Sequence, residues 1–65
     1  MLSPGDKGFQ VEKLQRALKK AGFWNKDIDG AYSKELSEAV KSFQKSKSLN
    51  ADGVAGQDTQ RALGM

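Results

Sequence analysis

The sequence predicts a small all-α protein, a compact three-helix bundle made of one domain over residues 1–65. Three segments carry apolar residues at helical spacing, and Gly-containing loops separate them. Two of these loops contain an Asp-Gly pair, which is a strong signal for a tight turn. A chain of this length buries only about 60% of the surface that its unfolded form exposes. We therefore expect one small core and a stability of roughly 3–5 kcal/mol.

The first helix is expected over residues 7–21. Asp6 is suited to be its N-cap, and Gly22 stands where a left-handed residue ends a helix. The apolar residues of the segment recur every three or four positions, as on one face of a helix. They are Val11, Leu14, Leu18 and Ala21.

The second helix is expected over residues 34–47, with Ser33 as its N-cap. Its apolar stripe consists of Leu36, Ala39, Val40 and Phe43. The third helix is short and is expected over residues 57–63. Its inward-facing residues are expected to be Thr59, Ala62 and Leu63. Four apolar residues outside the helices are expected to close the ends of the core: Leu2, Ile28, Leu49 and Val54.

The two Asp-Gly turns also align with each other as parts of a degenerate repeat. Asp29-Gly30 and Asp52-Gly53 lie 23 residues apart, and the apolar positions of the helices that follow them keep the same spacing. A weaker third copy begins at Lys7. Because a single unit cannot bury its own apolar face, the units are expected to pack around a shared core.

The composition argues against most catalytic chemistry. The chain has no Cys and no His, so it has no disulfide, no thiolate metal site, and neither the commonest general base nor the commonest metal ligand. We expect no catalytic residue, no metal and no cofactor. The net charge of +3 is mild, and acidic residues interrupt the basic ones throughout. This pattern is typical of solvated helix faces, with weak attraction to anionic polymers.

Nothing in the chain indicates a membrane segment or an export signal. No run of 18 apolar residues is present, so we expect no transmembrane helix. The first residues show no basic stretch followed by an apolar one, so we expect no signal peptide. If the protein works outside the cytoplasm, either its export information lies elsewhere or it leaves the cell by lysis.

Three blocks of the chain, in order, resemble the peptidoglycan-binding domain family. The first is Gly8-x-x-Val11-x-x-Leu14-Gln15-x-x-Leu18-x-x-x-Gly22-Phe23. The second is Asp29-Gly30-x-Tyr32-Ser33-x-x-Leu36-x-x-Ala39-Val40-x-x-Phe43-Gln44. The third is Asp52-Gly53-Val54-Ala55-Gly56-x-x-Thr59-x-x-Ala62-Leu63. The family often has Phe-Gly where this chain has Tyr32-Ser33, a change that leaves an acceptable N-cap but can alter what is recognised at that turn.

The resemblance implies a three-helix module at one end of a cell-wall hydrolase, such as an amidase, a spore cortex-lytic enzyme or a phage endolysin. Its expected function is non-catalytic binding of bacterial peptidoglycan, which targets an attached catalytic domain. The expected location is extracellular, in the cell wall or in the periplasm, and the expected state is a monomer without nucleic-acid or membrane partners. A related arrangement occurs in metalloprotease propeptides that carry a zinc-blocking Cys, which this chain lacks.

Peptidoglycan is expected to bind through aromatic faces and fixed polar groups in a shallow groove. The candidate groove is formed by the loop of residues 24–32, the start of the second helix and the turn of residues 52–56. The candidate ligand-binding residues are Trp24, Asp29, Tyr32, Gln44, Asp52 and Thr59.

Each candidate also has a structural role open to it. Trp24 can cap the core, and Tyr32 can pack its ring while it exposes its hydroxyl group. Asp29 and Asp52 can cap their turns. Gln44, like Gln15 after its own core leucine, can satisfy loop backbone groups, and Thr59 can serve as a packing residue at a helix start.

Three other functions are compatible with parts of the sequence. A protein-interaction or inhibitory prodomain would bind a catalytic domain and not the wall polymer. A nucleic-acid module would need a basic recognition helix, for which the third helix offers only Gln57, Gln60 and Arg61. An enzyme would need a carboxylate pair such as Asp27 and Asp29, which lie in a loop with a turn-forming role already.

Overall fold

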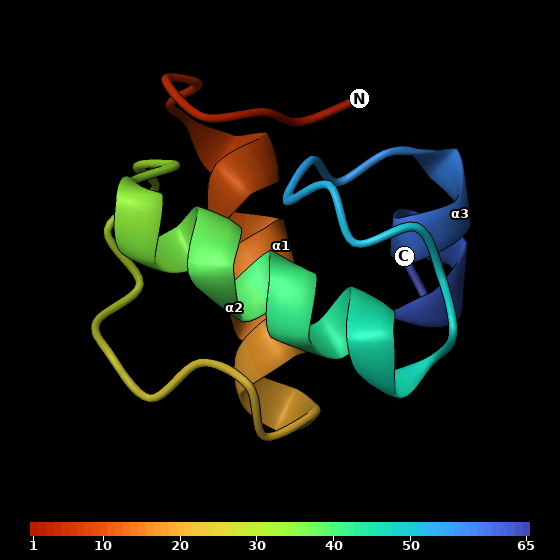
Figure 1. Cartoon of the computed structure of the whole chain (residues 1–65). Helices are drawn as coiled ribbons and strands as arrows, with labels where there is room; N and C mark the ends of the chain where they lie inside the picture. The colour runs from red at the N-terminus through yellow and green to blue at the C-terminus, as the bar shows by residue number, and fades with distance from the viewer.

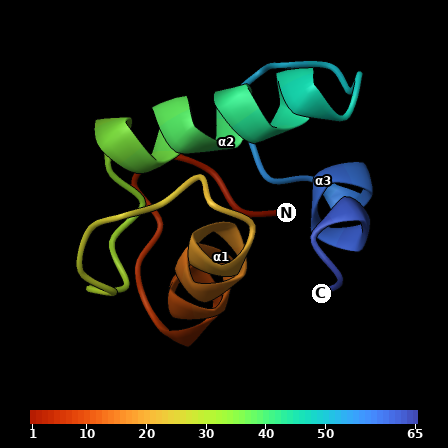
Figure 2. The same ribbon diagram turned by 90° about the horizontal axis from the view of Figure 1, so that it is seen from below.

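The computed structural model describes residues 1–65 and contains three helices and no strands: α1 (Phe9–Lys20), α2 (Lys34–Ser46) and α3 (Gln57–Ala62). The expected all-α three-helix class is confirmed. Viewed from below, α1 is seen nearly end-on while α2 runs across the picture, so these two helices cross steeply (Figure 2). The short α3 lies beside the C-terminal half of α2 (Figure 1). None of the three helices has the length and apolar character needed to cross a membrane.

The helices bury one shared apolar core. Phe23 and Phe43 meet edge to face, with ring centroids 5.5 Å apart, at the rim of this core. Leu2, Ile28 and Leu63 are half-buried and pack against it. The nine buried apolar residues are Val11, Leu14, Leu18, Trp24, Tyr32, Leu36, Val40, Phe43 and Ala55.

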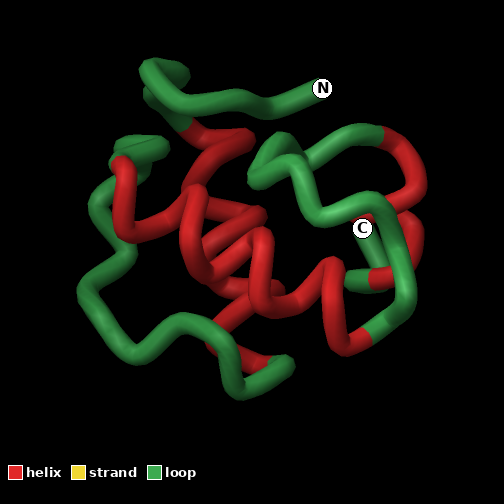
Figure 3. The backbone as a smooth tube through the Cα atoms, in the orientation of Figure 1, coloured by secondary structure: helices red, strands yellow, loops and turns green.

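Long loops make up much of the chain, and backbone hydrogen bonds fix them to one another (Figure 3). Leu2 and Ala55 exchange both of their backbone hydrogen bonds, at 3.0 and 2.8 Å. The Gly8 N–H donates to the Gly30 carbonyl at 2.9 Å. The N-terminal segment is therefore tied to both Asp-Gly regions, which limits how far those loops can move.

Two helix starts test the predicted caps. Ser33 is the N-cap of α2, as expected, and its Oγ accepts a hydrogen bond from the Leu36 N–H at 3.3 Å. The prediction for α1 is wrong: its N-cap is Gly8, at φ 121°, without a side-chain cap. Asp6 instead accepts a hydrogen bond from the Ser3 N–H at 3.0 Å. The carboxylate stabilises the turn before the helix.

Two small residues predicted to face inward are exposed. Ala21 is the C-cap of α1, and Ala62 is the last residue of α3. Both residues line an open hollow beside Phe23 and Leu63, so no other side chain covers them. The core contact of α3 comes from Thr59, which is buried, and from the half-buried Leu63.

Candidate functional site

Two buried glutamines hold the two Asp-Gly turns in the same way. The Gly30 N–H donates to Gln15 Oε1 at 2.9 Å, and Gln15 Nε2 donates to Asp29 Oδ1 at 2.8 Å. The Ala31 N–H donates to the same carboxylate oxygen at 3.0 Å. We call the set Gln15, Asp29 and Gly30 the first clamp. Gly30 has φ 72°, a backbone conformation that favours glycine.

The second clamp consists of Gln44, Asp52 and Gly53 and repeats these bonds. The Gly53 N–H donates to Gln44 Oε1 at 3.0 Å, and Gln44 Nε2 donates to Asp52 Oδ1 at 3.1 Å. The Val54 N–H donates to Asp52 Oδ1 at 3.0 Å, and Gly53 has φ 75°. Both clamps therefore place a rigid amide–carboxylate pair between a helix and a turn.

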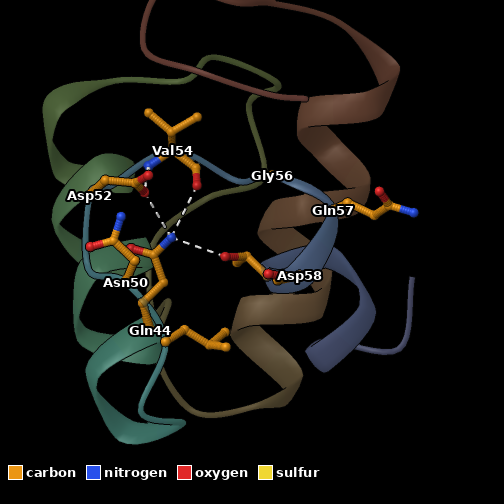
Figure 4. Close-up of a pocket in the computed structure, with 9 residues that line it drawn as sticks. Gln44, Asn50, Asp52, Val54, Gly56, Gln57 and Asp58 are labelled. Atoms are coloured by element: carbon orange, nitrogen blue, oxygen red, sulfur yellow. Dashed lines mark hydrogen bonds between the residues drawn. The ribbon is translucent and has the colours of Figure 1, made fainter.

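Only the second clamp opens on a hollow. The hollow has a volume of about 330 Å³ and lies between the C-terminal half of α2, the loop of residues 49–56 and the start of α3 (Figure 4). Seven of its nine lining residues are not hydrophobic. They are Gln44, Asn50, Asp52, Gly56, Gln57, Asp58 and Thr59.

Gln44 stands at the centre of this hollow (Figure 4). Gln44 is only 1% exposed to solvent, and its Nε2 lies within hydrogen-bonding distance of three acceptors. These are Asp52 Oδ1 at 3.1 Å, the Val54 carbonyl at 3.0 Å and Thr59 Oγ1 at 2.9 Å. The polar wall of the hollow is thus a connected network of hydrogen bonds, which holds its donors and acceptors in fixed positions.

Both clamp carboxylates are held in the ionised form. Hydrogen bonds from the Gln15 amide and then from the Ala31 N–H lower the pKa of Asp29 from its ordinary value. The pKa of Asp52 is lowered mainly by the hydrogen bond from the Val54 N–H, and to a smaller extent by the one from the Gln44 amide. Asp52 therefore presents a negative charge at the hollow at neutral pH.

Of the six predicted site residues, the hollow brings together Gln44, Asp52 and Thr59. Asp29 lies in the first clamp, away from the hollow. No residue of the loop of residues 24–32 lines this hollow or the second surface hollow described below, although the preceding residue, Phe23, lines the second one. The hollow shares the turn of residues 52–56 with the expected groove but not the loop of residues 24–32.

The two aromatic candidates belong to the core. Trp24 is 7% exposed and its Nε1–H donates to the Asp27 carbonyl at 3.2 Å, so its ring face is not open to a sugar. The sequence was compatible with an exposed Tyr32 hydroxyl, but this hydroxyl donates to the Gly53 carbonyl at 2.7 Å in a buried contact. Burial raises the pKa of Tyr32 to about 12.

Three lining residues with polar side chains were not predicted: Asn50, Gln57 and Asp58. Their only sequence signal is proximity to Asp52 and Thr59 along the chain. A second hollow, of about 460 Å³, lies between the C-terminal ends of α1 and α2 and the end of α3. It is mainly apolar, with Lys20 and Lys47 among its lining residues, and contains none of the predicted residues.

The structure is that of a small all-α domain with a polar hollow on its surface. The family described as "Putative peptidoglycan binding domain" matches residues 7–63. The chain belongs to this family, and the resemblance seen in its three sequence blocks is confirmed.

Relatives and solved structures agree with this assignment. The N-acetylmuramoyl-L-alanine amidase CwlL of Bacillus licheniformis is 40% identical over 65 residues, which cover 97% of this chain and 18% of that protein. The crystal structure of a Burkholderia AP3 phage endolysin gives a TM-score of 0.91 at 44% identity, covering 95% of this chain and 24% of that chain. The crystal structure of the SleB N-terminal domain gives a TM-score of 0.92 at 34% identity, and the match covers 95% of this chain and 85% of that chain. The chain thus spans less than a fifth of the curated relative's length.

Proposed function

We propose that residues 1–65 act as a single non-catalytic domain that binds bacterial peptidoglycan and holds an attached cell-wall hydrolase on its substrate. The observation that carries the proposal is the polar hollow around Gln44, found in a chain whose family match covers residues 7–63. The similarity to an amidase and an endolysin, each several times longer than this chain, supports the attachment to a catalytic domain.

The use of Asp29 and Asp52 in their turns supports the non-catalytic role. An enzyme without His or Cys depends on carboxylates or a tuned Lys. Asp52 Oδ1 already accepts two hydrogen bonds that shape its turn, and Asp29 is used in the same way. Both have a lowered pKa, whereas a general acid needs a raised one.

A hollow of about 330 Å³ that is open to solvent is suited to one short wall fragment. We expect millimolar to micromolar affinity, about 4–8 kcal/mol. Such weak binding is sufficient for targeting, because a wall offers many sites at high effective concentration. The place of action that we propose is the cell wall, outside the cytoplasm or in the periplasm, with the domain as a monomer and without a nucleic-acid or membrane partner.

The test is a pull-down of the domain with insoluble purified peptidoglycan, with and without teichoic acids, at two salt concentrations. Sedimentation with the bare wall at high salt is expected. Binding that requires teichoic acids and is lost at high salt would assign the attraction to the +3 charge instead. Absence of binding would favour a protein-interaction or inhibitory prodomain.

A matched pair of variants locates the site. Asn50 lines the hollow, whereas Asn25 lies in the loop of residues 24–32, and both are exposed. In Asn50→Lys, the long side chain can lie over the hollow and pair with Asp52, so wall binding should decrease. Asn25→Lys adds the same charge elsewhere and should bind like the parent chain. The opposite result would return the site to the loop of residues 24–32.

A further inference from the structure

The second hollow leaves part of the apolar core open to solvent. Its volume is about 460 Å³, six of its nine lining residues are hydrophobic, and we call it the apolar hollow. Two of the six are Phe23 and Phe43, whose rings meet edge to face with centroids 5.5 Å apart. Phe23 is only half-buried, so part of its ring can contact a ligand. The other four are small or aliphatic: Ala17, Ala21, Ala62 and Leu63.

The apolar hollow offers few fixed polar groups. Its three polar lining residues are Lys20, Ser46 and Lys47. The Ser46 hydroxyl donates to the Phe43 carbonyl at 2.7 Å, so its hydrogen is already used. A ligand rich in hydroxyl groups, such as a glycan, would lose water at this surface without gaining matched hydrogen bonds. The strong donors that remain are the two lysine ammonium groups, and the two ion pairs of the chain involve neither of them.

Positive charge gathers at this end of the molecule. The segments of residues 16–26, 39–51 and 59–65, which include the C-terminal ends of the three helices, contain no acidic residue. Each helix C-terminus carries roughly half a negative charge, so the three ends together offset less than half of the five basic residues beside them. These residues stand in the last turns or at a C-cap: Lys19, Lys20, Lys45, Lys47 and Arg61. The apolar hollow therefore favours an anionic group.

The two hollows differ in the ligand chemistry that they suit. The polar hollow has Asp52 and Asp58 as its charged lining residues, whereas the apolar hollow has Lys20 and Lys47. The stem peptides of peptidoglycan combine the methyl groups of alanine with a free carboxylate. The glycan instead offers hydroxyl and N-acetyl groups, which the apolar hollow cannot match.

We propose that the apolar hollow binds the carboxylate end of a stem peptide, with alanine methyl groups against Phe23 and the carboxylate between Lys20 and Lys47. This second contact rests on the proposed peptidoglycan binding, and it defines the part of the polymer that this face recognises. A wall fragment held at both hollows would contact the domain on two sides of the α2–α3 contact, since Gln44 and Thr59 line one hollow and Phe43 and Leu63 the other.

The probe is N-acetyl-D-alanyl-D-alanine with a free carboxylate, compared with its C-terminal amide and with N-acetylglycylglycine. Each is titrated into the full ¹⁵N-labelled chain at about 0.01 M ionic strength, where the screening length is about 30 Å. The free acid should shift the backbone amides of residues 20–23, 46–47 and 62–63. It should bind about fivefold more tightly than its amide, the factor for two unit charges about 4 Å apart in water. The glycine probe should bind about fourfold more weakly, the factor for one buried methyl group.

Two matched double variants test the charges. In Lys20→Gln with Lys47→Gln the side chains stay polar and flexible but lose their charge, and the preference for the free acid should fall below about twofold. Lys7→Gln with Lys34→Gln lowers the net charge by the same amount. Both of these lysines are exposed and line neither hollow, so the control should keep the fivefold preference. Equal preferences in the two double variants would overturn the proposal.

The remaining outcomes separate the possible occupants. Equal binding of the free acid and its amide, or shifts confined to residues 52–59, would overturn the proposal. An N-acetylglucosamine trimer that shifts the same amides as strongly would assign the apolar hollow to the glycan, and shifts on dilution of the chain alone would assign it to a second copy. Both results count against the stem peptide. Absence of any shift, in a chain that still sediments with the wall, also overturns the proposal, whereas failure to sediment would reject the proposed function itself.

Discussion

Gly53→Ala is the substitution for which the structure gives the sharpest expectation. Gly53 is the point where the second clamp is joined to the core. Its N–H bonds to Gln44, and its carbonyl accepts hydrogen bonds from the Tyr32 hydroxyl at 2.7 Å and from Ser37 Oγ at 3.1 Å. A Cβ atom at this position would lie 2.5 Å from Ser37 Oγ, closer than real Cβ atoms approach other atoms.

The expected cost has two parts. Alanine at φ 75° costs about 1–2 kcal/mol, because its Cβ crowds the backbone in the left-handed region. Ser37 must also rotate away and lose its hydrogen bond to the Gly53 carbonyl, for about 1 kcal/mol more. Gly22 is the control, since it has φ 90° and nothing within 4 Å of an added Cβ. Gly22→Ala should therefore cost about 1–2 kcal/mol and Gly53→Ala about 2–3 kcal/mol.

Urea unfolding followed by fluorescence measures both costs, because Trp24 is the single tryptophan and is buried. In a Ser37→Ala background the clashing oxygen is absent. Gly53→Ala should then cost no more than Gly22→Ala, which gives a coupling energy of about 1 kcal/mol. Equal costs for the two glycines in the parent chain, or no coupling with Ser37, would show that the contact does not constrain this turn.

Two further predictions concern pH. Tyr32 has a pKa of about 12 in the folded chain and an ordinary value of 10.0, so the folded state disfavours its ionisation. The contribution of Tyr32 to the free energy of unfolding is therefore complete below pH 10 and decreases as the pH rises toward 12. As the single tyrosine, Tyr32 can be titrated by its absorbance, and Tyr32→Phe should remove this alkaline loss at a cost of about 1 kcal/mol. The pKa values of Asp29 and Asp52 are lowered below 3.8, so their contribution is complete above that value and is lost as pH falls through the folded pKa values. In the double variant Asp29→Asn with Asp52→Asn, the urea concentration at the unfolding midpoint should fall less steeply between pH 5 and pH 2 than in the parent chain. An unchanged pH dependence would contradict this role of the clamps.

The fold was predictable where apolar spacing runs through the middle of a helix. Val11, Leu14 and Leu18 are fully buried, as the helical pattern predicts, and Leu36 and Val40 behave in the same way. The pattern failed at helix ends, where Ala21 and Ala62 keep the spacing but line an open hollow and stay exposed. The α1 cap was missed because a distant contact, between the Gly8 N–H and the Gly30 carbonyl, decides where the helix begins.

The site was predictable only in part, since one sequence signal serves two purposes. An aromatic residue beside a turn can stack on a ligand or fill the core, and the sequence does not show the space available. Trp24 and Tyr32 fill the core in this structure. Asn50 reaches the hollow because of the path of its loop, which depends on tertiary contacts and leaves no periodic pattern.

Thr59 is the residue that distinguishes the second clamp from the first. It stands 23 residues after Leu36, so the second unit has a hydroxyl group where the first has a fully buried leucine. In Thr59→Val the shape is kept and Gln44 Nε2 still has two acceptors, Asp52 Oδ1 and the Val54 carbonyl, for its two hydrogens. The free energy of unfolding should change by less than about 1 kcal/mol, whereas wall binding should weaken about fivefold through the loss of one ligand hydrogen bond.

Thr59→Ser provides the opposite combination. It keeps the hydroxyl group and should keep wall binding, but it deletes a buried methyl group and should cost about 1 kcal/mol of stability. Urea unfolding and wall sedimentation, measured on both variants, separate the two properties. If binding follows stability in both variants, Thr59 only supports the fold. If binding follows the hydroxyl group, the Thr59 hydroxyl group at the wall of the hollow is also what the wall fragment contacts.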